Sequence, residues 1–209
     1  IGVIAYRHST GKDLEKYEAS FFDVFDTQTQ IIGYASSKEQ FSEQMSLIKD
    51  KFQYYNDLYD IYHDYEGMNN IKTINDNAGI QPVKVDEEII ELLKLGITMD
   101  EKTDGNMNIA MGSVLSIWHD YREAGSEDPY SAELPPMDEL ERAAEHTDIH
   151  DIVIDEEVST VYLTDPDMSL DVGSIGKGYA VQKVAEYAKN ELGIRYMLFS
   201  VGGNVCAIG

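Results

Sequence analysis

The sequence predicts a globular domain that mixes helices and strands, and three observations support this. Hydrophobic residues make up 43% of the 209 positions, which is enough to build a core. Residues 21–34 are rich in β-branched and aromatic side chains, which are typical of strands, whereas apolar residues after Lys38 recur at helical spacing. A glycine-rich stretch, residues 169–180, predicts the end of a short strand, a tight turn and the start of a helix. We expect the chemistry to lie at that turn.

The charge balance limits the classes of function. The chain carries 16 Lys and Arg residues against 39 Asp and Glu residues, a formal net charge of −23. Such a charge repels nucleic acid and anionic membrane surfaces, so we expect no nucleic-acid partner. An anionic ligand would need help from a helix N-terminus, a lysine or a divalent cation, which favours a metal cofactor. No run of about 18 apolar residues predicts a transmembrane helix.

The N-terminal residues differ from the rest. Residues 1–6 are mostly apolar and lack an initiator methionine, and a polar run follows them. We interpret residues 1–20 as a tether that forms the end of a removed signal or anchor region. The folded domain is expected over residues 21–209. The single cysteine, Cys206, lies in an apolar run and is expected to be a small buried hydrophobe.

The first half of the domain predicts strands and then long helices. Residues 21–34 should form a strand pair or one long strand. One helix face is then expected from apolar residues at steps of three and four, namely Phe41, Met45, Ile48, Phe52, Tyr55, Tyr59 and Tyr62. Ser36 or Ser37 would cap this helix, which should end near residues 65–67. The stripe would also suit a coiled coil, but packing within the domain is favoured. Residues 68–79 predict a loop that a ligand would order.

The second half alternates helices with short strands. Asp86 should cap a helix that ends near residues 103–105. The remaining expectations, in chain order, are a short strand and loop over 106–113 leading to a helix through Trp118 to Arg122, an exposed loop over 123–136, a short helix over 137–147, a hairpin of 152–154 and 158–163, the glycine turn, and a buried strand over 195–201.

The glycine turn has a chemical reason to bind phosphate. The first N–H groups of a helix lack partners within it, and the helix dipole adds positive charge there. Gly173, Gly176 and Gly178 would let a ligand approach the backbone, Lys177 offers a cation, and Asp171 offers an acceptor or a metal ligand. An ordinary strand-to-helix turn with a surface lysine would look the same. The glycines alone therefore leave both interpretations open.

Three motifs in this chain resemble those of the ApbE family of FAD:protein FMN transferases. They are Asp-Gly-Asn-Met-Asn-Ile at 104–109, Asp-Val-Gly-Ser-Ile-Gly-Lys-Gly-Tyr-Ala at 171–180 and Val-Gly-Gly-Asn at 201–204. The resemblance covers residues 21–209. It implies an α+β fold of mixed sheets with packed helices, in which FAD is held between two lobes. It also implies an extracytoplasmic bacterial enzyme, attached to the cell membrane by an N-terminal anchor or lipid outside this chain.

The resemblance implies a specific reaction. A family member splits the pyrophosphate of FAD with Mg²⁺, attaches FMN to a threonine or serine of a partner flavoprotein, and releases AMP. Acceptors in the family include membrane subunits of sodium-pumping and Rnf-type complexes. The alternative is a protein that binds FAD, or hydrolyses it to FMN and AMP, without transfer. A third alternative, from another class, is an acidic domain that binds only protein.

The resemblance also assigns roles to residues of this chain. The implied FAD-binding residues are Phe25, Tyr65, Asn106, Met107, Asn108, Asp171 and Lys177. Tyr65 would stack on the isoalloxazine, and Phe25 would form an apolar wall, with a place in the core as the alternative. Asp171 is also the catalytic candidate for activating the acceptor hydroxyl. Ser174 occupies a metal-ligand position, through its backbone oxygen. The family's other metal ligands, an acidic residue and a threonine, lie beyond the last motif, so the domain is expected to be truncated at Gly209.

Overall fold

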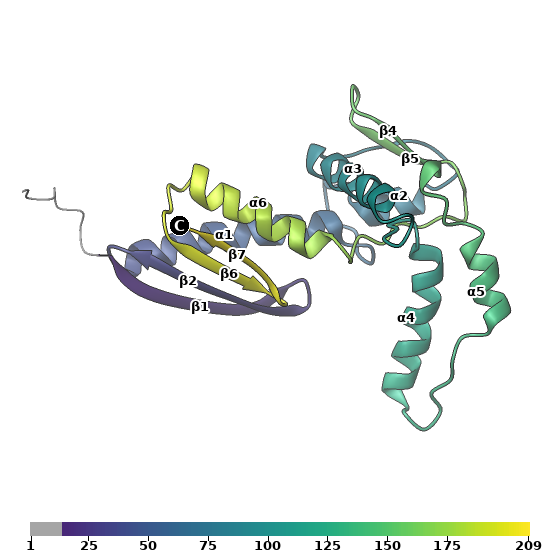
Figure 1. Cartoon of the computed structure of the whole chain (residues 1–209), viewed down its shortest axis with the longest axis horizontal. Coiled ribbons are helices and arrows are strands. Elements are labelled where there is room, and N and C mark those ends of the chain that lie inside the picture. The colour runs from purple at the N-terminus through teal and green to yellow at the C-terminus, as the bar shows by residue number, and fades with distance from the viewer. Residues whose placement is uncertain (1–13) are drawn as a thin grey trace, which may run out of the picture. The chain divides into compact units, whose positions relative to one another are not determined.

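The chain divides into two compact units in the computed structural model, which describes residues 14–209 (Figure 1). Unit 1 comprises the described residues up to Tyr54 together with Ala180–Gly209, and unit 2 comprises Tyr55–Tyr179. The division falls within two helices, α1 (Lys38–Tyr59) and α6 (Gly176–Asn190). The prediction of mixed helices and sheets is confirmed.

Unit 1 contains a four-stranded antiparallel sheet in the order β1-β2-β6-β7. Its strands are β1 (Glu15–Val24), β2 (Thr27–Ala35), β6 (Met197–Val201) and β7 (Asn204–Ile208). The predicted strand pair and the buried strand are therefore confirmed. Residues 15–20 were predicted to belong to the tether, but they form the first part of β1. The rest of the predicted tether, except Leu14, lies outside the described residues.

The β6–β7 hairpin was not predicted. Gly202 and Gly203, at φ 52° and 90°, form the two-residue turn between these strands. Both residues need positive φ in such a turn, which glycine adopts without strain. The two glycines of the Val-Gly-Gly-Asn motif therefore have a structural role as a hairpin turn.

The apolar stripe of α1 is buried, as predicted. Phe41, Ile48 and Phe52 are at most 5% exposed, and the rings of Phe52 and Phe199 lie 6.3 Å apart. This part of the stripe therefore packs within unit 1 rather than in a coiled coil. Ser37 caps the helix, because its Oγ accepts a hydrogen bond from the Gln40 N–H.

The helix ends at Tyr59, earlier than predicted. The Asp60 carboxylate accepts the N–H groups of Tyr62 and His63 at 2.6 and 3.2 Å, and this local turn replaces the next helical turn. Tyr62, which the periodicity placed on the buried stripe, is 55% exposed. That part of the prediction is wrong.

Unit 2 is mainly helical, with a small antiparallel sheet in the order β3-β5-β4. Its elements are α2 (Ile71–Asp76), β3 (Val83–Lys84), α3 (Glu87–Lys102), α4 (Gly112–Glu127), α5 (Met137–Ala144), the 3₁₀ turn η1 (Ile149–Asp151), β4 (Ile152–Asp155) and β5 (Thr160–Leu163). The predicted β4–β5 hairpin is confirmed. Asp86 caps α3 as predicted, because its carboxylate accepts the Glu88 N–H at 3.0 Å.

Three local predictions for unit 2 are wrong. Residues 68–79 are not simply a loop, because they contain α2. No strand forms over residues 106–113 or before the glycine turn; the only pairing there, among the described residues, is an isolated bridge between Met111 and Ser169. Helix α4 also continues to Glu127, into the segment predicted as a loop.

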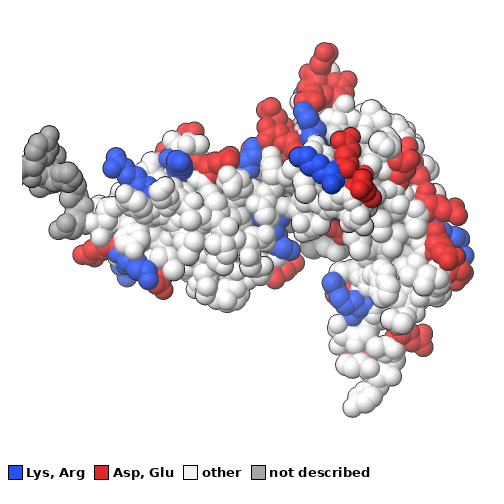
Figure 2. Space-filling view, in the orientation of Figure 1, with Lys and Arg blue, Asp and Glu red and all other residues white. Residues whose placement is uncertain are grey.

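The surface reflects the acidic composition. On the face shown in Figure 2, acidic side chains gather over the tip of the β4–β5 hairpin and over α5. Asp155 ends β4, and Glu156 and Glu157 follow it in the hairpin turn. Within the described part of the chain, no helix combines the length and the apolar character needed to cross a bilayer.

Candidate functional site

The segment that leads to the glycine turn is fixed by backbone hydrogen bonds. The Asp171 N–H donates to the Ile109 carbonyl at 2.9 Å, and the Gly112 N–H donates to the Ser169 carbonyl at 2.9 Å. Gly112 allows this close approach, because a Cβ there would lie 2.5 Å from the Ser169 oxygen. Residues 169–171 are therefore tied to the loop between α3 and α4.

A side chain from α2 holds the same segment from another element. The Asn75 Nδ2 donates to the Leu170 carbonyl at 3.1 Å, and the Leu170 N–H donates to the Asn75 Oδ1 at 2.8 Å. The amide of Asn75 thus satisfies both backbone groups of one residue, as a neighbouring strand would.

The turn itself orients Asp171. The Gly173 N–H donates to the Asp171 Oδ1 at 2.8 Å, and the N–H groups of Ile175 and Gly176 both donate to the Val172 carbonyl. Two N–H groups at the mouth of α6 are therefore already bonded, and the prediction that they are free for phosphate is wrong for these two. Among the described residues, the Asp171 Oδ2 makes no hydrogen bond. This oxygen is the one available to a ligand.

Asp171 lines a cleft of about 540 Å³ within unit 2. The other lining residues are Tyr62, residues of α4 and residues of the loop that follows α4: Leu115, Trp118, His119, Tyr121, Arg122, Gly125, Ala132, Glu133 and Leu134. Tyr62 and Trp118 are 55% and 43% exposed, so their rings are accessible. A concave surface with aromatic side chains and few charged groups is suited to a planar ring with polar substituents.

Several polar groups of the cleft contact one another. The Tyr62 and His119 rings lie 5.2 Å apart, and the Arg122 Nη2 lies 2.8 Å from the His119 Nδ1. Since the guanidinium can only donate, the His119 Nδ1 must accept. Burial, and then the charge of Asp171, raise the pKa of Tyr62. Tyr62 therefore keeps its proton at neutral pH and can donate a hydrogen bond in the cleft.

Tyr65, the predicted stacking residue, is half-buried and does not line this cleft. Its hydroxyl donates to the Asp60 Oδ2 at 2.7 Å. Burial, and then this hydrogen bond, raise the pKa of Tyr65 well above its usual range. Burial alone would raise the pKa of Asp60, but the hydrogen bonds from Tyr62, Tyr65 and His63 outweigh it and lower the pKa. The hydroxyl of Tyr65 is therefore committed, and only its ring is available to a ligand.

Residues 106–108, which were also predicted to bind FAD, do not line the cleft. Asn108 uses both ends of its amide on the backbone: its Oδ1 accepts the Ala110 N–H at 2.7 Å and its Nδ2 donates to the Thr147 carbonyl at 2.8 Å. Asn106 is exposed and Met107 is half-buried. Asn108 is therefore a structural residue of the loop that pairs with Asp171.

Phe25 belongs to unit 1, in the turn between β1 and β2. It adopts φ 55°, and the next residue, Asp26, adopts φ 48°. A bulky residue at positive φ is strained, which makes the position notable. Phe25 is half-buried, so it is not one of the fully buried side chains of the core.

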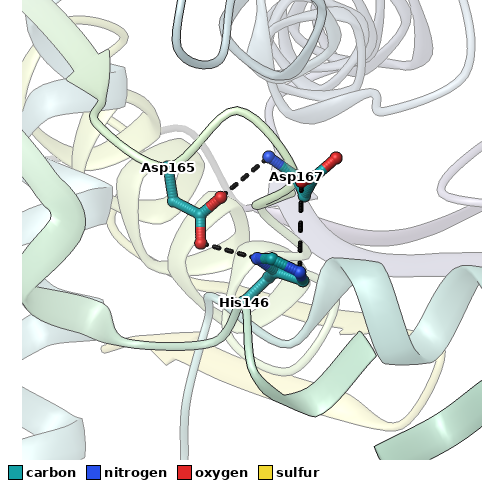
Figure 3. Close-up of side chains that lie close together, drawn as sticks. All are labelled: His146, Asp165 and Asp167. Atoms are coloured by element: carbon teal, nitrogen blue, oxygen red, sulfur yellow. Dashed lines mark hydrogen bonds and ion pairs between the residues drawn. The ribbon is translucent and has the colours of Figure 1, made fainter. Parts of the chain in front are cut away.

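Ser174, the predicted metal ligand, is exposed in the turn before α6, and Lys177 is half-buried in the first turn of that helix. A different group of possible metal ligands lies elsewhere in unit 2. His146, Asp165 and Asp167 offer ligand atoms that all lie within 4.8 Å of one another (Figure 3).

The His146 group already forms an internal ion pair. The His146 Nδ1 lies 2.7 Å from the Asp165 Oδ2, and its Nε2 lies 4.0 Å from the Asp167 Oδ2. The hydrogen bond with Asp165 raises the pKa of His146, while the Asp167 N–H and then His146 lower the pKa of Asp165. An imidazole with two carboxylates is a donor set for transition ions rather than for Mg²⁺. The side chains of His146 and Asp165 are therefore partners of each other without an ion.

Several functional candidates were missed in the sequence. Leu115, Trp118, His119 and Arg122 are spaced to share one face of a helix, so their helical periodicity was a readable signal. No local signal singles out Asn75, because its partner Leu170 is 95 residues away.

The family model that matches this chain is described as the ApbE family and covers residues 25–209. The chain is 25% identical over 186 residues to a FAD:protein FMN transferase of Klebsiella pneumoniae, covering 89% of this chain and 56% of that protein. It is 29% identical over 144 residues to a FAD:protein FMN transferase of Treponema pallidum, covering 66% of this chain and 38% of that protein. The chain thus spans about half the length of these curated relatives, or less.

Solved structures share the fold. The ApbE protein of Thermotoga maritima superposes with a TM-score of 0.76 at 25% identity, covering 93% of this chain and 59% of that chain. The flavin transferase ApbE of Vibrio cholerae superposes with a TM-score of 0.75 at 19% identity, covering 94% of this chain and 60% of that chain, which supports the fold alone.

Proposed function

The chain belongs to the ApbE family, and from this premise we propose that its protein is a Mg²⁺-dependent FAD:protein FMN transferase. It cleaves the pyrophosphate of FAD, attaches FMN to a threonine or serine of a partner flavoprotein and releases AMP. The curated relatives carry this name. The observation that carries the proposal is the Asp171 carboxylate: its Oδ1 is fixed by the Gly173 N–H, and the residue lines an accessible aromatic cleft.

Asp171 acts as the general base in this proposal. The acceptor hydroxyl oxygen attacks the FMN phosphorus, the new phosphoester bond forms, and the bond to the AMP phosphate breaks. The hydroxyl proton passes to the Asp171 Oδ2. The turn keeps the carboxylate in one orientation, so no side-chain freedom is lost at the moment of reaction.

The oxygen donors at the turn fit Mg²⁺. Ser174 is exposed in the turn, and Mg²⁺ is commonly held by one or two protein oxygens together with substrate phosphates and water. Ser174 would hold the ion, which supplies charge neutralisation at the pyrophosphate. Lys177 adds a cation in the first turn of α6.

The aromatic cleft supports a dinucleotide substrate. Tyr62 and Trp118 present accessible rings beside Asp171, and base–aromatic stacking stabilises a bound planar ring by about 1–3 kcal/mol. We keep Phe25, Tyr65 and residues 106–108 as further proposed FAD contacts, on the resemblance alone. A location outside the cytoplasm, with attachment to the membrane by an anchor or lipid, is proposed on the same basis.

The test is to incubate the full-length protein with FAD, Mg²⁺ and a threonine-containing acceptor. Mass spectrometry of the acceptor should show the FMN adduct, and chromatography should show AMP in equal amount. FMN and AMP without an adduct would favour hydrolysis, and bound FAD without turnover would favour a binding protein. Either result would refute the transferase proposal, as would a failure to bind FAD.

A further inference from the structure

We infer that Asn75 is a positioning residue for the reaction, acting through Asp171. This inference rests on the proposed function. Asn75 bonds both backbone groups of Leu170, the residue before Asp171, at 2.8 and 3.1 Å. No other side chain in the described part of the chain bonds the backbone of Leu170.

Asn75 is itself rigidly placed. Helix α2 is anchored by Ile71 and Ile74, which are at most 1% exposed. Asn70, fully buried, caps it: its Oδ1 accepts the Thr73 N–H at 3.0 Å, and the Thr73 hydroxyl accepts the Asn70 N–H at 3.1 Å. The Asn75 amide therefore reaches Leu170 from a fixed support rather than from a mobile loop.

Two neighbouring elements bond to different residues of segment 169–171. On one side, the loop before α4 bonds Ser169 and Asp171, through Gly112 and Ile109. On the other side, Asn75 is the one described residue that bonds the backbone of Leu170. Without the amide, the Leu170 N–H and carbonyl, which belong to a fully buried residue, would lose their partners. The segment would then move to satisfy these groups, and the Asp171 carboxylate would move with it.

The expected consequence is a loss of rate rather than of binding. Displacing a reacting group by about 1 Å costs on the order of 100-fold in rate. FAD binding is spread over many contacts, so its affinity should change far less. Asn75→Ala should therefore lower kcat for FMN transfer about 100-fold and raise KM for FAD less than about threefold.

The experiment compares three variants of the full-length protein in the FMN-transfer assay. Asn75→Ala removes both hydrogen bonds, and Asn75→Asp keeps the shape and the acceptor for the Leu170 N–H but loses the donor. Asn69→Ala is the control, because it removes one exposed amide-to-backbone bond, to the Lys84 carbonyl at 2.8 Å, and no bond to residues 169–171. We expect a large loss of kcat for the alanine, an intermediate loss for the aspartate and wild-type kcat for the control.

A double-mutant cycle separates positioning from general destabilisation. If Asn75 acts through Asp171, then Asn75→Ala should change kcat little in an Asp171→Asn background, whereas a merely structural effect would add in full. The Leu170 amide should also exchange faster with solvent in Asn75→Ala, since its acceptor is lost.

The failures are distinguishable. If the wild-type protein forms no FMN adduct, the proposed function is wrong and the positioning role falls with it. If the wild type forms the adduct and Asn75→Ala retains its kcat, or the two substitutions prove additive, the positioning role alone is overturned. Should Asn75→Ala not fold, Asn75→Asp carries the same test.

Discussion

Replacing Gly112 with alanine tests how tightly the Asp171 segment is packed. A Cβ at this position would lie 2.5 Å from the Ser169 oxygen and 2.7 Å from its carbonyl carbon, both backbone atoms. Neither can swing away as a side chain would, so the segment must shift. Overpacking of this kind costs about 1–3 kcal/mol. The better helix propensity of alanine offsets at most about 1 kcal/mol, since Gly112 is the first residue of α4.

Gly96→Ala is the matched comparison. There a Cβ would also lie 2.5 Å from its nearest neighbour, but its three nearest neighbours are side-chain atoms of Ile109 rather than backbone atoms. Gly96 lies inside α3, so alanine gains the full helix propensity of about 1 kcal/mol. Urea denaturation should show a larger loss of unfolding free energy for Gly112→Ala than for Gly96→Ala. Equal losses, or a stabilised Gly112→Ala, would refute the claimed close packing.

Further expectations follow from single residues. Asn70→Ala should lower the unfolding free energy by about 2–4 kcal/mol in urea titration, because it removes the cap of α2 and the two hydrogen bonds from the buried Asn70 amide to the carbonyls of Asp57 and His63. The hydrogen bond with Asp165 raises the pKa of His146 above 6.5, so the stabilisation by this pair is present below pH 6.5 and is lost as pH rises through the folded-state pKa. The stability gap between wild type and His146→Gln should therefore shrink as pH rises above 6.5. Trp118→Ala should weaken FAD binding by about 1–3 kcal/mol in fluorescence titration, and an unchanged affinity would remove the cleft from the site. Asp171→Ala should lower the rate of FMN transfer about 100- to 10,000-fold, as expected for the loss of a general base, while circular dichroism stays that of the wild type.

Much of the fold could be predicted, because hydrophobic periodicity and capping residues act locally. The stripe of Phe41, Ile48 and Phe52 identified α1, and Asp86 marked the start of α3. The prediction failed where a local pattern had a competing solution. Asp60 ends α1 by accepting backbone N–H groups, although the apolar spacing continues to Tyr62.

Helix α2 was missed because residues 68–79 are polar and rich in turn formers. Its stability comes from tertiary contacts: Asn70 donates to the carbonyls of Asp57 and His63, and Ile71 and Ile74 are buried. The spacing of Asn70 and Thr73 was the one local signal, since these two form the capping box.

The candidate site was predicted in part. The motif around Asp171 marked the turn, and the structure places this residue in a cleft. The predicted strand before the turn is absent, because side-chain and loop contacts from Asn75 and Gly112 take the place of a neighbouring strand. Such contacts join residues far apart in the sequence, and composition or periodicity carries no trace of them.

A structure of the full-length protein with FAD and Mg²⁺ would test the central claim most directly. We expect the pyrophosphate and the ion at the turn before α6, the Asp171 carboxylate beside the FMN phosphate, and a planar ring against Tyr62 or Trp118. A dinucleotide bound away from Asp171, or an Asp171 carboxylate that contacts neither ion nor ligand, would contradict it.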